Sequence, residues 1–474
     1  MADISSPGAS AIPQKRSFTP NEDSSIPRTK PPREKKDTWR KKEALQSGAG
    51  SVGTSGKQPE ASTPKSGPGT RHGELPGLVR YRLPPPRFQD YYGHRAPPMV
   101  HAELEAPKDG AYYSVTDHPM NRRSFRYSPC EASKLLPSLA YRGTEYEPFK
   151  ARINFEDMNG QLYVNKDGSD VTNTKGWRMA RANVGVREGD WYFEVKILNG
   201  ISEDGAPNGH VRLGWARREA PLDAPVGFDA YSYGLRDQNC QKVHMSRPKD
   251  FSPEQTFVTG DVIGLQISLP SLSLQRNISG DPTVKAGDII RDRIPIRFKN
   301  QLWFEHFEYY PTKDFEELMN PSSGTKNTPQ PKTLPGSYIR VYRNGTYIGT
   351  PFEDLYAFLP PASKPQTSGG GRELDDGSLG YYPAVSTFKG GAVHVNFGPD
   401  WLCRPDDLGS EVRGMWERYD EQIAEDVTYD LIDEVDLLFT AGGLITDDDN
   451  SKGIAAGAGR GGKEEIKEMV MEDE

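Results

Sequence analysis

The sequence predicts a mainly β protein: an antiparallel β-sandwich with long loop insertions, a C-terminal amphipathic helix and disordered termini. In the middle of the chain, apolar and polar residues alternate in several short segments, and no helical segments lie between them. Only 34% of the 474 residues are hydrophobic, while 48 are glycine and 40 are proline. A low overall hydrophobic fraction combined with local apolar segments indicates one well-packed domain together with long loops and unstructured chain.

Residues 1–75 are predicted to be a disordered basic arm, because Ser, Pro and Gly dominate and apolar residues are sparse. Its segment 28–42 carries eight Lys or Arg residues and two acids. Such a cluster is typical of a nuclear-import signal, of a chain that binds DNA phosphates through its charge, or simply of a solvated tail. The candidate residues for DNA contact or nuclear import are Arg33, Lys35, Lys36, Arg40, Lys41 and Lys42.

Residues 76–146 form an extended segment rich in Tyr and Pro, with little periodicity. We expect it to lie over a domain as extended chain rather than to make a domain, and its aromatic residues are too frequent for a simple linker. Whether it packs on the following domain is left open by its sequence.

Residues 147–405 are predicted to be the folded domain, because their apolar residues recur with a period of two. The clearest alternation is in 191–198, 210–216, 262–269 and 392–398. One apolar face in each indicates half-buried antiparallel strands, and many short strands without intervening helices indicate a β-sandwich.

Turns and insertions complete the predicted domain. Asn344-Gly345 and Asp167-Gly168 are favoured where a turn needs positive φ angles. Three polar stretches are expected to be long loop insertions between strands. They are 270–293, 311–335 and 361–378.

After the domain, the segment 411–440 is predicted to be an amphipathic helix, followed by a disordered acidic tail at 441–474. Apolar residues recur at every fourth position: Met415, Tyr419, Ile423, Val427, Leu431 and Val435. The opposite face is acidic and is expected to be solvated. An isolated helix of this length is marginal in water, so the apolar stripe predicts docking into a partner's groove, with packing on its own domain as the alternative.

Several classes of function are disfavoured. No segment has the roughly 18 uninterrupted apolar residues of a membrane span, and the N-terminus lacks a signal-peptide pattern. The three cysteines are far apart and form no zinc or disulfide framework. The sequence lacks the HExxH and GxSxG patterns, and a phosphate-loop-like stretch at 51–58 has Ser51 and Gln58 at its two key positions. We therefore expect no catalytic residues, metal or cofactor.

Four segments appear in an order that resembles a SPRY domain. They are the R-L-G-W strand 212–215, the P-x-G-F-D-x-Y-S-Y turn 225–233, the Y-x-N-G hairpin 342–345 and N-F-G-P at 396–399. The resemblance covers about residues 155–405. More narrowly, the chain resembles the SPRY subunit of the COMPASS-type histone H3 lysine methyltransferase complex, the Bre-two family of fungi and Ash-two-like family of animals.

The resemblance implies a nuclear, non-catalytic scaffold of an H3 lysine-4 methyltransferase complex. A pocket on the sandwich holds an acidic segment of a WD-repeat subunit in this family, and the pair supports the catalytic SET domain. The matching positions are Trp177, Arg212, Pro225, Phe228 and Arg236. Two guanidinium groups suit carboxylates, which they bind bidentately. The family usually has Tyr at the positions of Trp177 and Phe228, so any contact through that hydroxyl is lost here.

The resemblance extends to the terminal helix, which is similar to the family's motif for docking into a Dpy-thirty-like (Sdc-one-like) homodimer. Its six apolar residues, Met415 to Val435 at every fourth position, are the implied contacts.

Three further arginines, Arg181, Arg217 and Arg218, are expected to add positive charge near the pocket on the sandwich without direct contact with the acidic segment.

One alternative function comes from another class. A SPRY domain also serves as the substrate receptor of some ubiquitin ligases, next to a RING, B-box or SOCS-type segment. Three isolated cysteines do not supply the zinc-binding members of that set.

Overall fold

The computed structural model describes residues 86–91, 96–97, 99–104, 110–115, 118–119, 125–279, 289–291, 293–320, 330–365 and 375–440. The predicted basic arm, with its six candidate Lys and Arg residues, and the predicted acidic tail lie outside the described residues.

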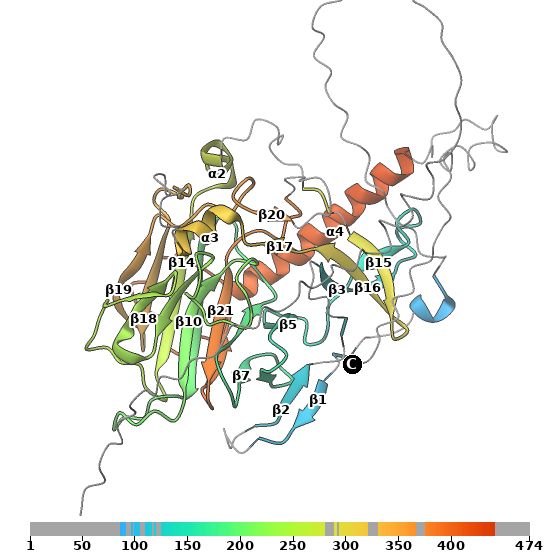
Figure 1. Cartoon of the computed structure of the whole chain (residues 1–474). Coiled ribbons are helices and arrows are strands. Elements are labelled where there is room, and N and C mark those ends of the chain that lie inside the picture. The colour runs from blue at the N-terminus through green and yellow to red at the C-terminus, as the bar shows by residue number, and fades with distance from the viewer. Residues whose placement is uncertain are drawn as a thin grey trace, which may run out of the picture. The chain divides into compact units, whose positions relative to one another are not determined.

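Two antiparallel sheets face each other and form the sandwich (Figure 1). The larger sheet has the order β1 (Met99–Ala102), β2 (Tyr112–Val115), β6 (Tyr163–Val164), β7 (Asp170–Thr172), β22 (Ala392–Asn396), β9 (Gly189–Asn199), β14 (Val262–Leu269), β18 (Tyr338–Arg343) and β19 (Thr346–Glu353). The second sheet has the order β13 (Arg247–Lys249), β12 (Lys242–His244), β11 (Ser232–Arg236), β10 (His210–Ala216), β21 (Tyr382–Phe388), β8 (Arg178–Ala182) and β5 (Ile153–Met158).

The predicted sandwich is confirmed, and the four clearest predicted strands are β9, β10, β14 and β22. Their alternating apolar residues meet between the sheets, where Phe193 of β9 packs edge-on against Trp215 of β10 with ring centroids 5.0 Å apart. Asn344 and Gly345 both have positive φ and form the turn between β18 and β19.

The central strand β9 is buried on both faces, whereas the alternation predicted a half-buried strand. The segment 397–412 and strand β23 (Arg413–Gly414), which pairs in parallel with β9, cover its outer face. Glu194 is fully buried there, and its carboxylate accepts hydrogen bonds from the backbone N–H groups of Leu402 and Cys403 at 2.7 and 3.1 Å. This buried carboxylate therefore holds the chain that leads into the terminal helix.

A third sheet joins distant parts of the chain, and the sequence did not predict it. Its order is β15 (Arg293–Phe298), β16 (Gln301–Phe307), β3 (Phe125–Ala132) and β4 (Tyr141–Gly143). The Tyr- and Pro-rich segment thus contributes paired strands, because β3 finds its hydrogen-bonding partner in β16.

Each of the three predicted insertions contains a short element within the described residues. These are α2 (Leu272–Ser279), α3 (Lys313–Met319) and β20 (Lys364–Pro365), which pairs with β17 (Tyr309–Tyr310). Two short 3-10 helices, η1 and η2, span Phe88–Tyr91 and Gln238–Cys240.

The predicted terminal helix is α4 (Met415–Thr440), which Figure 1 shows running from the sandwich past the third sheet. None of the helices among the described residues is both long and apolar enough to cross a membrane.

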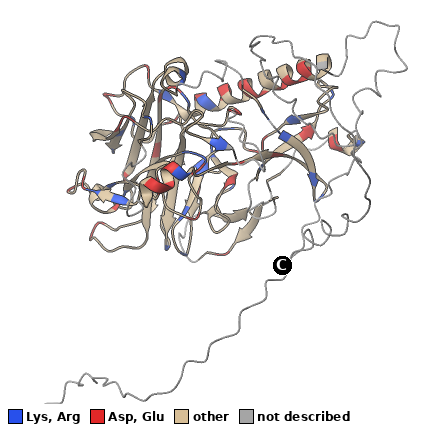
Figure 2. Cartoon of the chain, turned by 45° about the horizontal axis from the view of Figure 1, so that its top comes forward, with Lys and Arg blue, Asp and Glu red and all other residues tan. Residues whose placement is uncertain are grey.

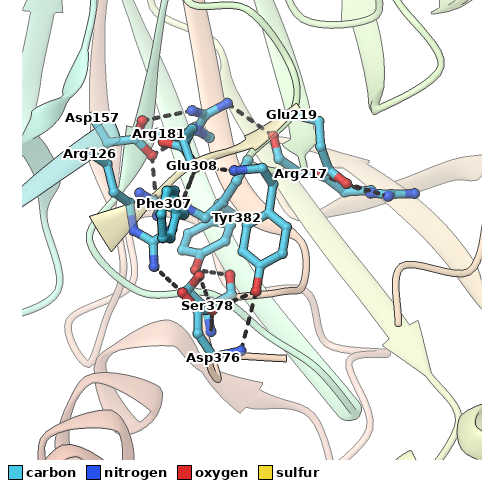
Figure 3. A network of polar contacts seen from close by, with 12 residues as sticks. Arg126, Asp157, Arg181, Arg217, Glu219, Phe307, Glu308, Asp376, Ser378 and Tyr382 are labelled. Atoms are coloured by element: carbon cyan, nitrogen blue, oxygen red, sulfur yellow. Dashed lines mark hydrogen bonds and ion pairs between the residues drawn. The ribbon is translucent and has the colours of Figure 1, made fainter. Parts of the chain in front are cut away.

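A network of ion pairs attaches the third sheet to the sandwich (Figure 3). Asp157 of β5 binds Arg181 of β8 through two hydrogen bonds of 2.6 and 2.7 Å. Arg126 of β3 pairs with Asp376 and donates to the backbone oxygen of Phe307 at 2.8 Å. Burial opposes ionisation of Asp157, but the positive charges of Arg181 and of neighbouring Arg218 outweigh it and lower its pKa to about 2.

We expect Asp157→Asn to lower the free energy of unfolding by about 3–5 kcal/mol at neutral pH, because it leaves Arg181 buried without its carboxylate. An unfolded Asp has a pKa near ~3.9, so the lowered folded-state pKa stabilises the protein above pH ~4, and this contribution is lost as the pH falls towards ~2. Urea unfolding of both proteins as the pH is lowered measures the free energy of unfolding. The difference in this free energy between wild type and variant should narrow on acidification, and a difference that stays constant with pH would contradict the assignment.

Candidate protein-binding sites

The two predicted arginines lie side by side on the outer face of the second sheet. Arg212 of β10 and Arg236 of β11 are directly opposite each other in the antiparallel register, so their side chains leave the sheet on the same face. Trp177, which precedes β8, lies under the Arg212 guanidinium, with the guanidinium carbon 4.8 Å from the ring centroid. The ring of Phe388 stacks on Trp177 at 5.2 Å. We call Arg212, Arg236 and Trp177 the arginine site.

The arginine site has no carboxylate partner within the described residues. Arg212 is half-buried, makes no ion pair there, and its Nε has no hydrogen-bond partner. Arg236 donates from Nη1 to the Gln241 side-chain oxygen at 2.6 Å. Burial, reinforced by the charge of Arg236 and opposed by Asp237, lowers the pKa of Arg212 to about 10. The negative charge of a bound carboxylate counteracts both effects because it favours the charged guanidinium, so the site is suited to an anionic ligand.

The other two predicted residues belong to a turn on the same face. Phe228 donates its backbone N–H to the oxygen of Pro225 at 3.0 Å. The turn lies directly on β11, because a Cβ added to Gly234 would be 2.6 Å from the oxygen of Val226. The Phe228 side chain is 44% exposed, and no ring contact joins it to Trp177 among the described residues. It is available to a ligand but is not part of the stacked group.

The predicted contribution of three further arginines to the positive field is wrong. Arg181 binds Asp157, Arg217 binds Glu219 at 2.5 Å, and Arg218 lies 3.7 Å from Asp157. Their charges are neutralised inside the domain, by Asp157 of another strand for Arg181 and Arg218 and by a carboxylate two residues along the chain for Arg217 (Figure 3).

The six apolar residues predicted for partner docking fall into two groups on α4. Met415 is fully buried, Tyr419 is buried and Ile423 is partly buried, all three against the protein's own core. Val427, Leu431 and Val435 are about half exposed, at 51%, 53% and 47%. The proximal half of the helix is therefore anchored on its own domain, and the distal half presents apolar side chains to solvent.

Helix geometry explains this division. Four residues turn an α-helix by about 400°, which is about 40° more than a full turn. Five such steps, from Met415 to Val435, rotate the position by about 200°, so the two ends of the predicted stripe lie on opposite faces. Ile432, Leu438 and Phe439 are also exposed. We call Val427, Leu431, Ile432, Val435, Leu438 and Phe439 the outer apolar face.

The acidic side chains of α4 were predicted to be solvated, and for Asp430 and Glu434 this is wrong. Figure 2 colours the acidic positions along the helix red and the basic positions on the strands near it blue. Asp430 is buried and pairs with Arg291 and Arg293, which also contact Asp433. The described residues of α4, the third sheet and the sandwich also line a cavity of about 660 Å³.

The SPRY domain family matches residues 190–275. The chain is 45% identical over 465 residues to COMPASS component cclA of Colletotrichum higginsianum, covering 83% of this chain and 82% of that protein. It is 47% identical over 377 residues to Set1 complex component ash2 of Schizosaccharomyces pombe, covering 79% and 55%. It is 31% identical over 334 residues to Set1/Ash2 histone methyltransferase complex subunit ASH2 of Drosophila melanogaster, covering 69% and 51%. The chain thus spans about half the length of the latter two relatives, and the predicted resemblance is confirmed.

The two halves of α4 are expected to respond differently to truncation. Met415→Ala removes a buried side chain and should lower the free energy of unfolding by about 2–5 kcal/mol. Val435→Ala, on the outer apolar face, is the matched control and should change it by less than ~0.5 kcal/mol. Urea unfolding of the full chain measures both. Equal losses would contradict the division of the helix.

Proposed function

The chain belongs to the family of COMPASS components that includes the cclA, Bre2 and Ash2 proteins, and from this membership we propose that it is a non-catalytic scaffold subunit of a nuclear histone H3 lysine-4 methyltransferase complex. The relatives' names describe components of COMPASS or Set1 complexes, and they support a role in assembly. In this role the chain brings other subunits together around a SET-domain methyltransferase and supports its activity.

The arginine site carries the proposal. Its two adjacent guanidinium groups have no carboxylate partner among the residues that the structure describes, and one of them stacks on an indole ring. Such a site is suited to an acidic peptide. We assign this site to an acidic segment of the WD-repeat subunit. The exposed ring of Phe228, next to Pro225, supplies apolar contact for the same segment.

The outer apolar face of α4 is the second contact. Its six side chains are 45–58% exposed, and they lie on the distal half of a helix whose proximal half is anchored. A helix with an exposed apolar face needs a groove, which two paired copies of a small helical protein provide. We assign it to a Dpy-thirty-like homodimer, with Val427, Leu431 and Val435 as predicted contacts. Met415, Tyr419 and Ile423 support the helix from inside.

Arg212→Ala combined with Arg236→Ala should nearly abolish binding to the WD-repeat subunit. Truncating one side of a desolvated charge pair typically costs about 2–5 kcal/mol, and here both cations are removed. Isothermal titration with the recombinant WD-repeat subunit measures the affinity.

Arg276→Ala combined with Arg340→Ala is the matched control, since it removes the same charge from two half-buried arginines outside the arginine site. This control should bind as wild type does. Undiminished binding by the Arg212 and Arg236 double variant would refute the assignment of the site.

Leu431→Asp combined with Val435→Asp should abolish binding to the Dpy-thirty-like homodimer, because it puts charges on the outer apolar face. Light scattering on size-exclusion fractions measures complex formation. Binding to the WD-repeat subunit should be unchanged. Tyr347→Asp, at an exposed aromatic residue of β19, is the control. A homodimer complex that persists with the double variant would rule out this face.

A further inference from the structure

The distal half of α4 contacts the third sheet through buried ion pairs. Arg291, just before β15, places Nη2 at 2.9 Å from Asp430 Oδ1 and 3.0 Å from Asp433 Oδ2. Arg293, in β15, also pairs with Asp430. Three of these four side chains are 8% exposed and that of Asp433 is 14% exposed. Removing one partner would leave the other charge poorly solvated and unpaired, so each of these side chains depends on its partner.

A second contact lies one helical turn further along α4. The Glu434 carboxylate accepts hydrogen bonds from the backbone N–H of Ser138 at 2.9 Å and of Leu139 at 2.7 Å, in the turn between β3 and β4. The guanidinium of Arg293 in turn stacks over Phe304 of β16, with its carbon 4.4 Å from the ring centroid. We call Arg291, Arg293 and the backbone N–H groups of 138–139 the helix clamp.

The helix clamp sets the rotation of α4 about its axis. Asp430, Asp433 and Glu434 lie within about 100° of one another around the helix, and Leu431 and Val435 are about 100° and 140° from Asp430. With the acidic residues turned inward, the outer apolar face points to solvent. The opposite rotation would bury apolar side chains against two arginines and leave those charges unpaired.

We propose that Arg291 and Arg293 are positioning residues for partner assembly: they hold the distal half of α4 in the helical state and rotation in which the outer apolar face meets the homodimer. This proposal rests on the docking of α4 proposed above. A free helical segment is marginally stable in water, and the apparent affinity of a partner falls by the fraction of chains in the competent state. The helix clamp orders the distal half of α4 in the free protein, so binding of the partner does not have to order it.

The test uses the full chain and compares two double variants. Arg291→Ala with Arg293→Ala should weaken binding to the homodimer by about tenfold or more, since the competent fraction falls. Amides of 426–440 should exchange with solvent faster in the free variant, while amides of 415–423, anchored on the core, keep their protection. Arg291→Lys with Arg293→Lys retains the charges and should recover most of the affinity. Binding to the WD-repeat subunit should be unchanged in both, which shows that the sandwich is folded.

A variant in α4 itself serves as a control for the possibility that the arginine substitutions disrupt the third sheet. Glu434→Gln leaves both arginines and their partners in place and removes only the charge that the 138–139 N–H groups face. It should weaken homodimer binding less than the double alanine variant does, with faster exchange confined to the end of α4.

Three results would overturn the proposal. If the alanine pair binds the homodimer as tightly as wild type, while Leu431→Asp with Val435→Asp does not bind, docking stands and the clamp is refuted. If affinity falls but exchange of 426–440 is unchanged, the arginines contact the partner directly and are not positioning residues. If wild type does not bind the homodimer, the proposed docking itself fails, and the clamp with it.

Discussion

The structure depends on how its arginines are paired. Every buried arginine among the described residues faces a carboxylate: Arg152, Arg181, Arg217, Arg291 and Arg418. A buried cation without such a partner is costly. The pairs of Arg181 with Asp157 and of Arg291 with Asp430 therefore also fix the relative position of two separate segments. Arg212 and Arg236 depart from this rule at a half-exposed place, where another molecule can supply the missing carboxylate. The same physical requirement therefore explains both the internal ion pairs of the domain and the surface to which we assign an acidic peptide.

The paired arginines connect the sandwich to the terminal helix in two steps. Arg126 of β3 and Arg218, which follows β10, both lie near Glu308, at 3.6 and 3.5 Å, and Arg218 also lies 3.7 Å from Asp157 of β5. These ion pairs hold the third sheet on the sandwich. Arg291 and Arg293 then hold α4 against the third sheet. The third sheet, whose strands precede the sandwich strands or lie between them in the sequence, thus positions α4. This helix begins on the core of the sandwich and extends beyond it. The arginine site and the outer apolar face lie on separate elements, so the two partners that we propose would not compete for the same residues.

The sequence predicted what depends on local pattern and missed what depends on distant pairing. Alternation identified β9 and β10 and placed Arg212 opposite Val211 and Leu213, because a strand turns successive side chains to opposite faces. The third sheet could not be predicted, since β3 and β16 are far apart in sequence and nothing local encodes their register. The burial of Arg181 depends likewise on Asp157 from another strand. The division of α4 into two halves could have been predicted from the rotation per residue of a helix, because residues spaced by four do not stay on one face.

The most direct test of the central claim is to observe the arginine side chains while an acidic ligand binds. Nε–H signals of Arg212 and Arg236 can be followed by nitrogen-15 NMR in the full chain as the acidic segment of the WD-repeat subunit is added. Because Arg212 Nε has no hydrogen-bond partner in the described part of the chain, its signal should shift strongly on binding, together with that of Arg236 and the indole N–H of Trp177. Saturable binding that leaves these three signals in place would contradict the account.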